Sequence, residues 1–342
     1  MVAIPATGDG LGIAIIAVDV VFLAIAAVAI VLRLWSRRLT HLHFTLNDYL
    51  IVLAWPISAG LVVVAITAVV PGGAGQHIYN LPPGSIEYLS KGFPPMEILW
   101  ALANTAVKIS ILHLYITIFP KPVFQKFVYA TMGLVGGFCL VVVISGLTIC
   151  RPFEYFYNKS IEGSCGNQTT LVLASCIINL LVDVIIICLP MPLLWGLQMG
   201  RHKKIGLCVI FGLGTIICVI TILRIVSTLN FTIEDFSYTL PWLAIWTDLE
   251  PILGMTNACL PVMRPALKKI FFPSAFGVSS KTSPHNSRDL EYGNPKTRNS
   301  APSQRNLRNS NSQSLERVDD FAAGSDTEQN YSMEQITVEN TK

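Results

Sequence analysis

Long apolar runs, separated by short polar segments, occupy about the first 270 residues of the chain. Each run is close to the ~20 residues that an α-helix needs to cross the hydrocarbon core of a bilayer. Seven runs can be marked, at about residues 12–34, 48–70, 96–119, 127–149, 171–195, 205–228 and 241–263. The pattern therefore predicts an all-α membrane protein, built as a seven-transmembrane helix bundle.

The composition agrees with this pattern. Hydrophobic residues make up 52% and charged residues 13% of the 342 positions, whereas a soluble domain carries roughly 25% charged residues. The net charge of +3 indicates little by itself, and we expect no nucleic-acid partner. The partner that the composition does predict is the lipid bilayer.

The two ends of the chain differ from the helical domain expected at 12–272. Residues 1–11 are expected to form a short extracellular segment, with no removable signal peptide. Residues 273–342 are rich in Ser, Asn, Gln and Arg and poor in large apolar residues, so we expect a disordered cytoplasmic tail. The PALKKIFF segment at 265–272 is expected to form one or two helical turns lying on the membrane surface.

Lysine and arginine residues gather in alternate loops. Short cytoplasmic loops carry an excess of these residues, so the loops that contain them are expected to face the cytoplasm. The residues are Arg33, Arg37, Arg38, Lys121, Lys126, Arg201, Lys203, Lys204, Arg264, Lys268 and Lys269. The bias places the N-terminus outside and the C-terminus in the cytoplasm, and we expect the plasma membrane as the location.

The loops assigned to the outside hold two features typical of that side. Asn158, Asn167 and Asn230 each begin an N-x-[ST] sequence and are candidate glycosylation sites. Cys150 and Cys165 bracket the second outer loop in an oxidising position, which favours a disulfide. Closing a loop of about 15 residues contributes roughly 3 kcal/mol in the chain-entropy model. Two free thiols at helix ends are the alternative.

Five charged side chains fall in the core of the expected spans or in its outer half. Lys108 and Asp183 each lie about 18 Å from the outer end of their span, at ~1.5 Å per residue, and so close to the midplane. Arg224, Asp248 and Glu250 lie nearer the outside. An isolated charge in a span costs ~2.5–3.5 kcal/mol on insertion scales. We therefore predict that Lys108 pairs with Asp183 and that Arg224 pairs with Glu250.

Helical spacing gives four of the spans a polar stripe that faces the interior, because residues three, four or seven apart share one face of a helix. The stripes are Glu97, Trp100, Asn104, Lys108 and Tyr115; Cys176, Asn179, Asp183 and Pro190; Thr221, Arg224 and Thr228; and Trp246, Glu250, Gly254, Asn257 and Pro261. Three roles stay open for this polar interior. It forms a structural network, a ligand pocket open to the outside, or a path for ions or protons.

Several chemistries lack the residues that they need. A retinal pigment requires a lysine well inside the last helix, and the run 241–263 has none, so we expect neither retinal nor another cofactor. An intramembrane zinc hydrolase requires about three converging ligands, and only His113 of the six histidines lies in a span. The chain also lacks GxSxG, HExxH and Walker motifs, so we expect no metal site and no enzyme.

A series of motifs follows the expected spans in order. They are RLWSRR at 33–38, NDYLIVLAW at 47–55, KISILHLYITIFP at 108–120, CRPFEYFYN at 150–158, NLLVDVIIICLPMPLLWGLQM at 179–199 and IWTDLEPILGMTNACLPVMRP at 245–265. With these motifs the chain resembles the fungal rhodopsin-domain family, seven-helix integral membrane proteins of filamentous fungi related to the Pth11-like receptor candidates. The resemblance implies the seven-helix fold and, despite the family's name, no bound retinal.

The resemblance, the expected topology and the polar interior lead to one leading hypothesis. The chain is expected to be a receptor-like sensor of an external small-molecule or lipid ligand, signalling to a cytoplasmic partner such as a G protein. Two alternatives stay open. One is a transporter or channel that uses Lys108, Asp183, Arg224 and Glu250 as a relay, and the other is a non-signalling scaffold whose charges only hold the helices together.

Overall fold

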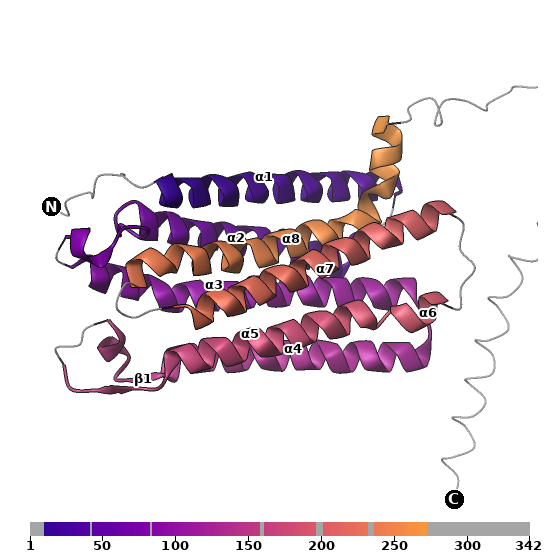
Figure 1. The fold of residues 1–342 in the computed structure, drawn as a ribbon. Coiled ribbons are helices and arrows are strands. Elements are labelled where there is room, and N and C mark those ends of the chain that lie inside the picture. The colour runs from indigo at the N-terminus through magenta and orange to yellow at the C-terminus, as the bar shows by residue number, and fades with distance from the viewer. Residues whose placement is uncertain are drawn as a thin grey trace, which may run out of the picture. The chain divides into compact units, whose positions relative to one another are not determined.

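The computed structural model describes residues 10–41, 43–82, 84–157, 161–195, 201–231 and 236–271. Within these ranges, seven long helices run side by side as a bundle (Figure 1). They are α1 (Gly10–Leu39), α2 (Leu46–Val69), α3 (Ser85–Ile118), α4 (Pro122–Thr148), α5 (Gln168–Cys188), α7 (Arg201–Leu229) and α8 (Phe236–Phe271). The shorter elements are η1 (Ile78–Asn80), β1 (Cys150–Arg151), η2 (Phe153–Phe156), β2 (Ser164–Cys165) and α6 (Met191–Trp195). The tail expected at 273–342 lies outside the described residues.

Of the described helices, six are long and apolar enough to cross a membrane. The segments are Gly12–Leu39, Leu46–Val69, Ser85–Ile118, Pro122–Thr148, Gln168–Leu193 and Val209–Leu229. The seventh expected span, 241–263, lies within α8, whose polar residues Thr247, Asp248, Glu250 and Asn257 lower its mean hydropathy. All four are buried inside the bundle, so α8 hides these polar side chains from its surroundings.

The third helix begins earlier than the sequence pattern predicts. The apolar run expected as the third span starts near residue 96, directly after Pro94 and Pro95, and proline removes an amide from the helical hydrogen-bond ladder. The structure instead continues α3 through both prolines back to Ser85. An exposed ion pair between Glu87 and Lys91, 2.8 Å apart, spans one turn of this extension.

Other boundaries follow the sequence more closely. The apolar run 171–195 is divided at Pro190, since α5 ends at Cys188 and the short α6 follows from Met191. At its C-terminus α8 continues as one helix to Phe271, and its last turns bend away from the bundle (Figure 1). The separate short helix expected at 265–272 is therefore the end of α8.

A buried ion pair between Arg33 and Asp48 ties α1, α2 and α8 together. Arg33 Nε donates to Asp48 Oδ1 at 2.8 Å, and Arg33 Nη1 donates to the carbonyl oxygen of Ala258 at 2.6 Å. Arg37 Nε lies 3.2 Å from Asp48 Oδ2. The same carboxylate accepts the backbone N–H of Thr45 at 2.9 Å, which caps the start of α2. The RLWSRR and NDYLIVLAW motifs thus meet at Asp48.

The opposite end of the bundle carries β1 and β2 (Figure 1). The two strands are antiparallel, with Cys150 opposite Cys165, and the two cysteines form a disulfide.

The loop after α2 is bonded to the start of α8. The N–H of Gly75 donates to the carbonyl oxygen of Ser237 at 2.8 Å. Gly75 has a φ of +100°, which glycine adopts readily. This contact fixes the loop after α2 to the start of α8.

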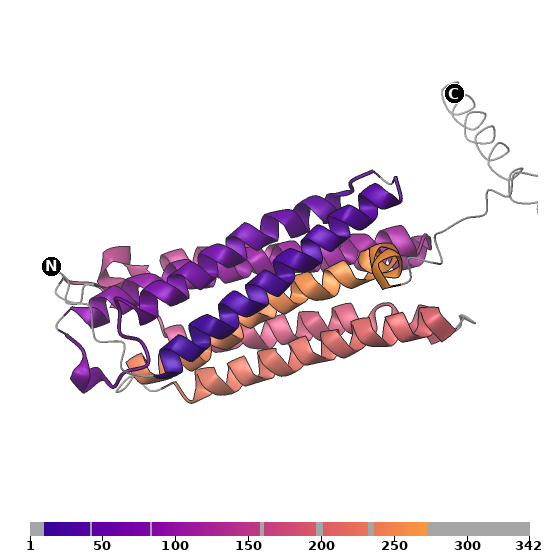
Figure 2. The same ribbon diagram turned by 90° about the horizontal axis from the view of Figure 1, so that it is seen from above.

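Helix α8 contacts α1, α2, α3 and α7 (Figures 1 and 2). Its Leu243, Ile252 and Met255 are fully buried. A Cβ atom added at Gly254 would lie 2.9 Å from Val107 Cγ1, so α3 and α8 approach too closely there for a larger side chain. The other helices are therefore packed around an element that carries several buried polar groups.

Replacing Asp48 with Asn removes the charge at the α1–α2–α8 contact and keeps the size of the side chain. Arg33 and Arg37 would then be buried without a counter-ion, and breaking a buried pair in this way costs ~3–5 kcal/mol. We expect a clear drop in the thermal midpoint of the full chain in detergent micelles, measured by size-exclusion chromatography after heating.

The matched control is Glu87→Gln, which removes one partner of the exposed pair with Lys91. Exposed pairs contribute little to stability, so this variant is expected to keep the wild-type midpoint. Equal midpoints for Asp48→Asn and Glu87→Gln would contradict a stabilising role of the buried cluster.

Candidate functional site

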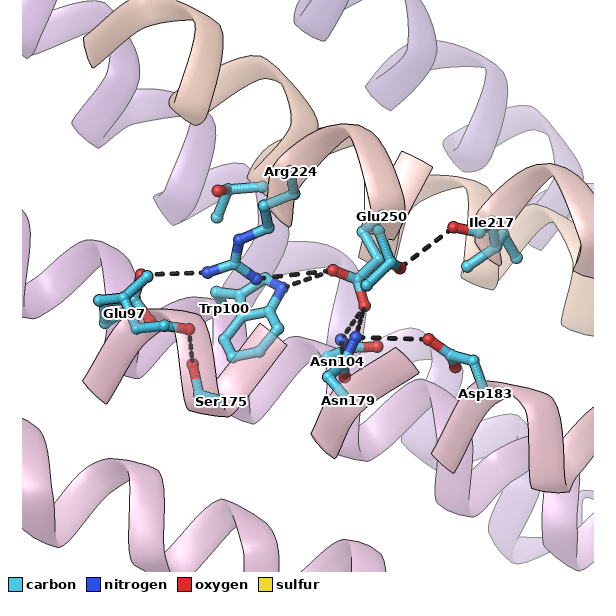
Figure 3. Close-up of polar contacts among 12 residues, drawn as sticks. Glu97, Trp100, Asn104, Ser175, Asn179, Asp183, Ile217, Arg224 and Glu250 are labelled. Atoms are coloured by element: carbon cyan, nitrogen blue, oxygen red, sulfur yellow. Dashed lines mark hydrogen bonds and ion pairs between the residues drawn. The ribbon is translucent and has the colours of Figure 1, made fainter. Parts of the chain in front are cut away.

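Polar side chains from the stripes of four helices meet in one continuous network, and its centre is Glu250 of α8 (Figure 3). Glu250 Oε2 accepts a hydrogen bond from Trp100 Nε1 at 3.0 Å. Glu250 Oε1 accepts from the Nδ2 groups of Asn104 and Asn179, the latter at 2.6 Å. One carboxylate therefore binds side chains from α3 and α5 to α8.

Arg224 of α7 lies beside this carboxylate (Figure 3). Its Nη1 is 3.6 Å from Glu250 Oε2, and its Nη2 donates to Glu97 Oε1 at 3.0 Å. The guanidinium carbon lies 3.8 Å from the centre of the Trp100 ring, a cation–π distance. Because Arg224 is fully buried, these partners offset the cost of removing its charge from water.

Lys108 of α3 and Asp183 of α5 form a second buried ion pair, with Nζ and Oδ1 2.9 Å apart. Lys108 Nζ also donates to Asn179 Oδ1 at 2.6 Å. Asn179 Nδ2 lies 3.3 Å from Asp183 Oδ2 as well as donating to Glu250. Asn179 thus joins the two ion-pair clusters, and α3, α5, α7 and α8 share one network.

Helical spacing anticipates most of this arrangement. The predicted pair of Lys108 and Asp183 is present. Arg224 contacts Glu250 as predicted, but it lies closer to Glu97, a pairing that was not expected from the sequence. Glu97 lies three residues before Trp100 on the α3 stripe, and this position was the sequence signal that it faces the interior and could pair with Arg224.

Asp248 and Asn257 lie apart from the network. Asp248 is only two residues from Glu250, so it faces another side of α8, where its carboxyl meets that of Asp19 in α1. Asp19 was not singled out from the sequence, although it is an acidic residue within the first apolar run. Asn257 lies two turns beyond Glu250 and lines a small cavity with Pro261.

The network side chains are buried, and three pockets among the described residues lie elsewhere. A groove of about 700 Å³ runs between α4, α5 and α6. A cavity of about 30 Å³ lies between α1, α2, α3 and α8, and one of about 40 Å³ lies between α3, α5, α7 and α8. None of the three is lined by Glu250, Arg224 or Lys108. In the part of the chain described, no three His, Cys, Asp or Glu side chains gather in a way that could hold a metal ion.

The candidate glycosylation sites are placed differently from one another. Asn158 lies outside the described residues. Asn167 caps α5, where its Oδ1 accepts the backbone N–H of Thr170 at 3.1 Å. Asn230 follows the end of α7. Asn167 and Asn230 are both exposed, and glycosylation at these sites stays a prediction.

Comparison with known proteins places this bundle among fungal membrane proteins. A model of the fungal rhodopsin domain matches residues 32–269. The polyenoic acids biosynthesis gene cluster protein Ba17b of Metarhizium anisopliae is 29% identical, over 76% of this chain and 75% of its own length. An SAT4 family membrane protein of Emericella nidulans is 26% identical, over 61% of this chain and 54% of its own. Receptor GIN3 of Arthrobotrys oligospora is 25% identical, over 77% and 66%. No solved structure matches the chain.

Replacing Glu250 with Gln tests the centre of the network. A glutamine amide has one acceptor oxygen and one donor group, so its NH₂ would face either Trp100 Nε1 or the two asparagine amides. Breaking the buried pair with Arg224 in this way is expected to cost ~3–5 kcal/mol. The measurement is the thermal midpoint of the full chain in detergent.

Glu97→Gln is the matched control, because it makes the same chemical change on another partner of Arg224. It keeps an acceptor oxygen for the guanidinium and leaves Glu250 in place, so we expect a smaller loss of ~1–2 kcal/mol. A larger loss for Glu97→Gln than for Glu250→Gln would contradict the central position of Glu250.

Proposed function

Because the chain belongs to the fungal rhodopsin domain family, we propose that it is a receptor-like membrane protein that senses an external ligand. In this proposal the seven long helices all span the membrane, with α8 as the seventh span. The N-terminus and the disulfide-bonded end face the outside, and the opposite end faces the cytoplasm.

Two features support this orientation. The disulfide between Cys150 and Cys165 lies at one end of the bundle, and structural disulfides persist in oxidising surroundings. The basic residues Arg33 and Arg37 in the last part of α1 and Lys121 at the start of α4 lie at the other end. An excess of Lys and Arg is typical of cytoplasmic loops.

The observation that carries the receptor proposal is the continuity of the buried network. Glu250 contacts side chains from α3, α5 and α7 at once. A shift of any one of these helices would therefore break its own contact with the Glu250 carboxylate, on which the other two helices also depend. Packed interiors respond by switching between discrete arrangements rather than by gradual deformation. A small-molecule or lipid ligand that displaces the outer end of one helix would thus change the positions of the others.

Helix α8 connects the network to the basic end. Its carbonyl oxygens at Ala258 and Val262 accept hydrogen bonds from Arg33 Nη1 at 2.6 Å and Ser36 Oγ at 2.7 Å. A movement of α8 would therefore reach the end of α1, where a cytoplasmic partner such as a G protein would bind. The similarity to a protein named Receptor GIN3 supports a receptor function.

A scaffold is the competing function, and the burial of the network favours it. Polar contacts between membrane helices contribute ~0.6 kcal/mol each on average and hold helices together without any movement. The transporter alternative requires an ion path through Lys108, Asp183, Arg224 and Glu250. An ion flux into liposomes that is unchanged by Asp183→Asn would rule out that path.

The receptor proposal is tested in cells that express the full chain with a panel of Gα reporters, screened with external small molecules and lipids. The wild-type chain is expected to give a ligand-dependent signal. Trp100→Phe removes the Nε1 donor to Glu250 and keeps an aromatic ring beside Arg224. Because it weakens the ligand-free arrangement, we expect the half-maximal ligand concentration to fall ~2–10-fold, the equivalent of one hydrogen bond.

Trp242→Phe is the matched control, since Trp242 is 46% exposed on the surface of α8. It is expected to keep the wild-type ligand response. If wild-type protein that reaches the cell surface activates no Gα with any ligand class, the receptor proposal fails and the scaffold remains.

A further inference from the structure

Two acidic side chains meet inside the bundle, apart from the network around Glu250. Asp19 of α1 and Asp248 of α8 are both fully buried. Helices α1 and α8 run parallel, because Arg33 and Ser36 of α1 contact Ala258 and Val262 of α8 in the same order. Gly75 lies against both Gly12 and Pro241, and Asp19 and Asp248 each follow seven residues further along, so the two carboxyl groups face each other at the same level. No N–H or O–H group of the described residues donates to any of their four oxygen atoms. The two carboxyl groups therefore face each other, and neither receives a hydrogen bond from the surrounding described residues.

The cations around the pair are already engaged. Besides Asp19, the charged group near Asp248 is the cation Arg224 of α7, but its guanidinium is shared between Glu97 and Glu250. In α3, which also packs against α8, the ionisable side chains that belong to the network are Glu97 and Lys108. Lys108 is paired with Asp183 at 2.9 Å.

On the remaining neighbour, α2, the only acidic or basic side chain is Asp48, at the basic end of the bundle. It is held there by Arg33 and Arg37. Arg38 of α1 is exposed and lies nineteen residues beyond Asp19, ~28 Å along the helix, and Lys91 of α3 pairs with Glu87. No cation among the described side chains of these helices is therefore positioned to neutralise Asp19 and Asp248.

A third buried polar group without a partner lies at the same level. Trp55 Nε1 of α2 donates to the carbonyl oxygen of Leu23 in α1 at 3.3 Å. Consecutive helices joined by a short loop run antiparallel, so a step forward along α2 corresponds to a step back along α1. Ser58 lies three residues after Trp55 and Asp19 lies four residues before Leu23, which places Ser58 level with Asp19. Ser58 is fully buried, and its hydroxyl has no hydrogen-bond partner among the described residues.

Two ionised carboxylates cannot remain in contact in a low-dielectric interior, because like charges at this distance repel strongly and burial penalises both. One proton placed between them removes one charge and supplies the missing donor. The resulting O–H···O⁻ hydrogen bond is of the strong, charge-assisted kind.

We propose that Asp19 and Asp248 form a proton-binding site that holds one proton between their carboxyl groups at neutral pH. The proton is released to water on alkalinisation, breaking the O–H bond and leaving two like charges at the contact of α1 with α8. Asp248 and Glu250 lie two residues apart on α8, so this helix links the proton site to the network. The site goes beyond the proposed receptor function and does not depend on it.

The first test is infrared spectroscopy of the purified full chain in lipid nanodiscs at neutral pH. The wild-type protein is expected to show the carbonyl stretch of a protonated carboxylic acid. Asp19→Asn and Asp248→Asn should each remove this band, because the amide donates to the remaining carboxylate in place of the proton. Glu162→Gln changes an exposed carboxylate and should keep the band. A wild-type protein without the band, or a band that survives both Asn variants, overturns the proposal.

Asp19→Glu provides the assignment if an Asn variant does not fold. It keeps a carboxyl group at this position, so it should shift the frequency of the band rather than remove it. A band that is identical in Asp19→Glu and wild type would belong to another residue and would overturn the assignment to this pair.

The second test is the pH dependence of the thermal midpoint. An exposed Asp ionises near ~3.9, so above that pH the unfolded chain has released the proton that the folded chain still holds. Stability therefore falls as pH rises through the titration of the pair. Asp19→Asn and Asp248→Asn should show a smaller fall than the wild type.

The same titration in sodium chloride and in choline chloride separates a proton from a metal ion. Equal curves in the two salts are expected for a shared proton. Stabilisation by sodium alone that is absent in Asp19→Asn would identify a sodium site and would overturn the proton proposal.

Discussion

A carboxylate removed from water inside a helix bundle has to be paired, and the burial of Glu250 imposes that requirement on the whole interior. Its two oxygens receive hydrogen bonds from Trp100, Asn104 and Asn179 and face the guanidinium of Arg224. The donors come from α3 and α5, and Arg224 comes from α7. Because a buried charge without partners is far more costly than a buried pair is stabilising, the position of Glu250 restricts α3, α5 and α7 relative to α8.

The same constraint explains why the most enclosed helix is also the least apolar of the expected spans. Helix α8 is surrounded by α1, α2, α3 and α7, so its polar groups face protein rather than lipid. Asp248 and the carbonyl of Ala258 face α1, whereas Glu250 faces side chains of α3, α5 and α7. A helix in this position can carry charges that a lipid-facing helix could not. Its low mean hydropathy follows from its central position.

The sequence was sufficient where local spacing determines the outcome. Asn179 and Asp183 are four residues apart, and a lysine at matching depth on the third span was enough to predict the pair with Lys108. It was not sufficient where packing between distant segments decides. The α3 helix continues through Pro94 and Pro95, and Arg224 takes Glu97 as its nearer partner. Asp19 was missed because a single acid in an apolar run has no informative spacing, and its partner is 229 positions away in the printed sequence.

The central claim is that buried charge pairs couple the helices, and a double-mutant cycle on Lys108 and Asp183 tests it most directly. Lys108→Met and Asp183→Leu each leave one charge buried alone, so each should destabilise the full chain in detergent by ~3–5 kcal/mol. The double variant leaves no lone charge at this pair and should be destabilised by much less than the sum, with a coupling of more than ~1 kcal/mol. Additivity of the two single changes within ~0.5 kcal/mol would contradict the claim.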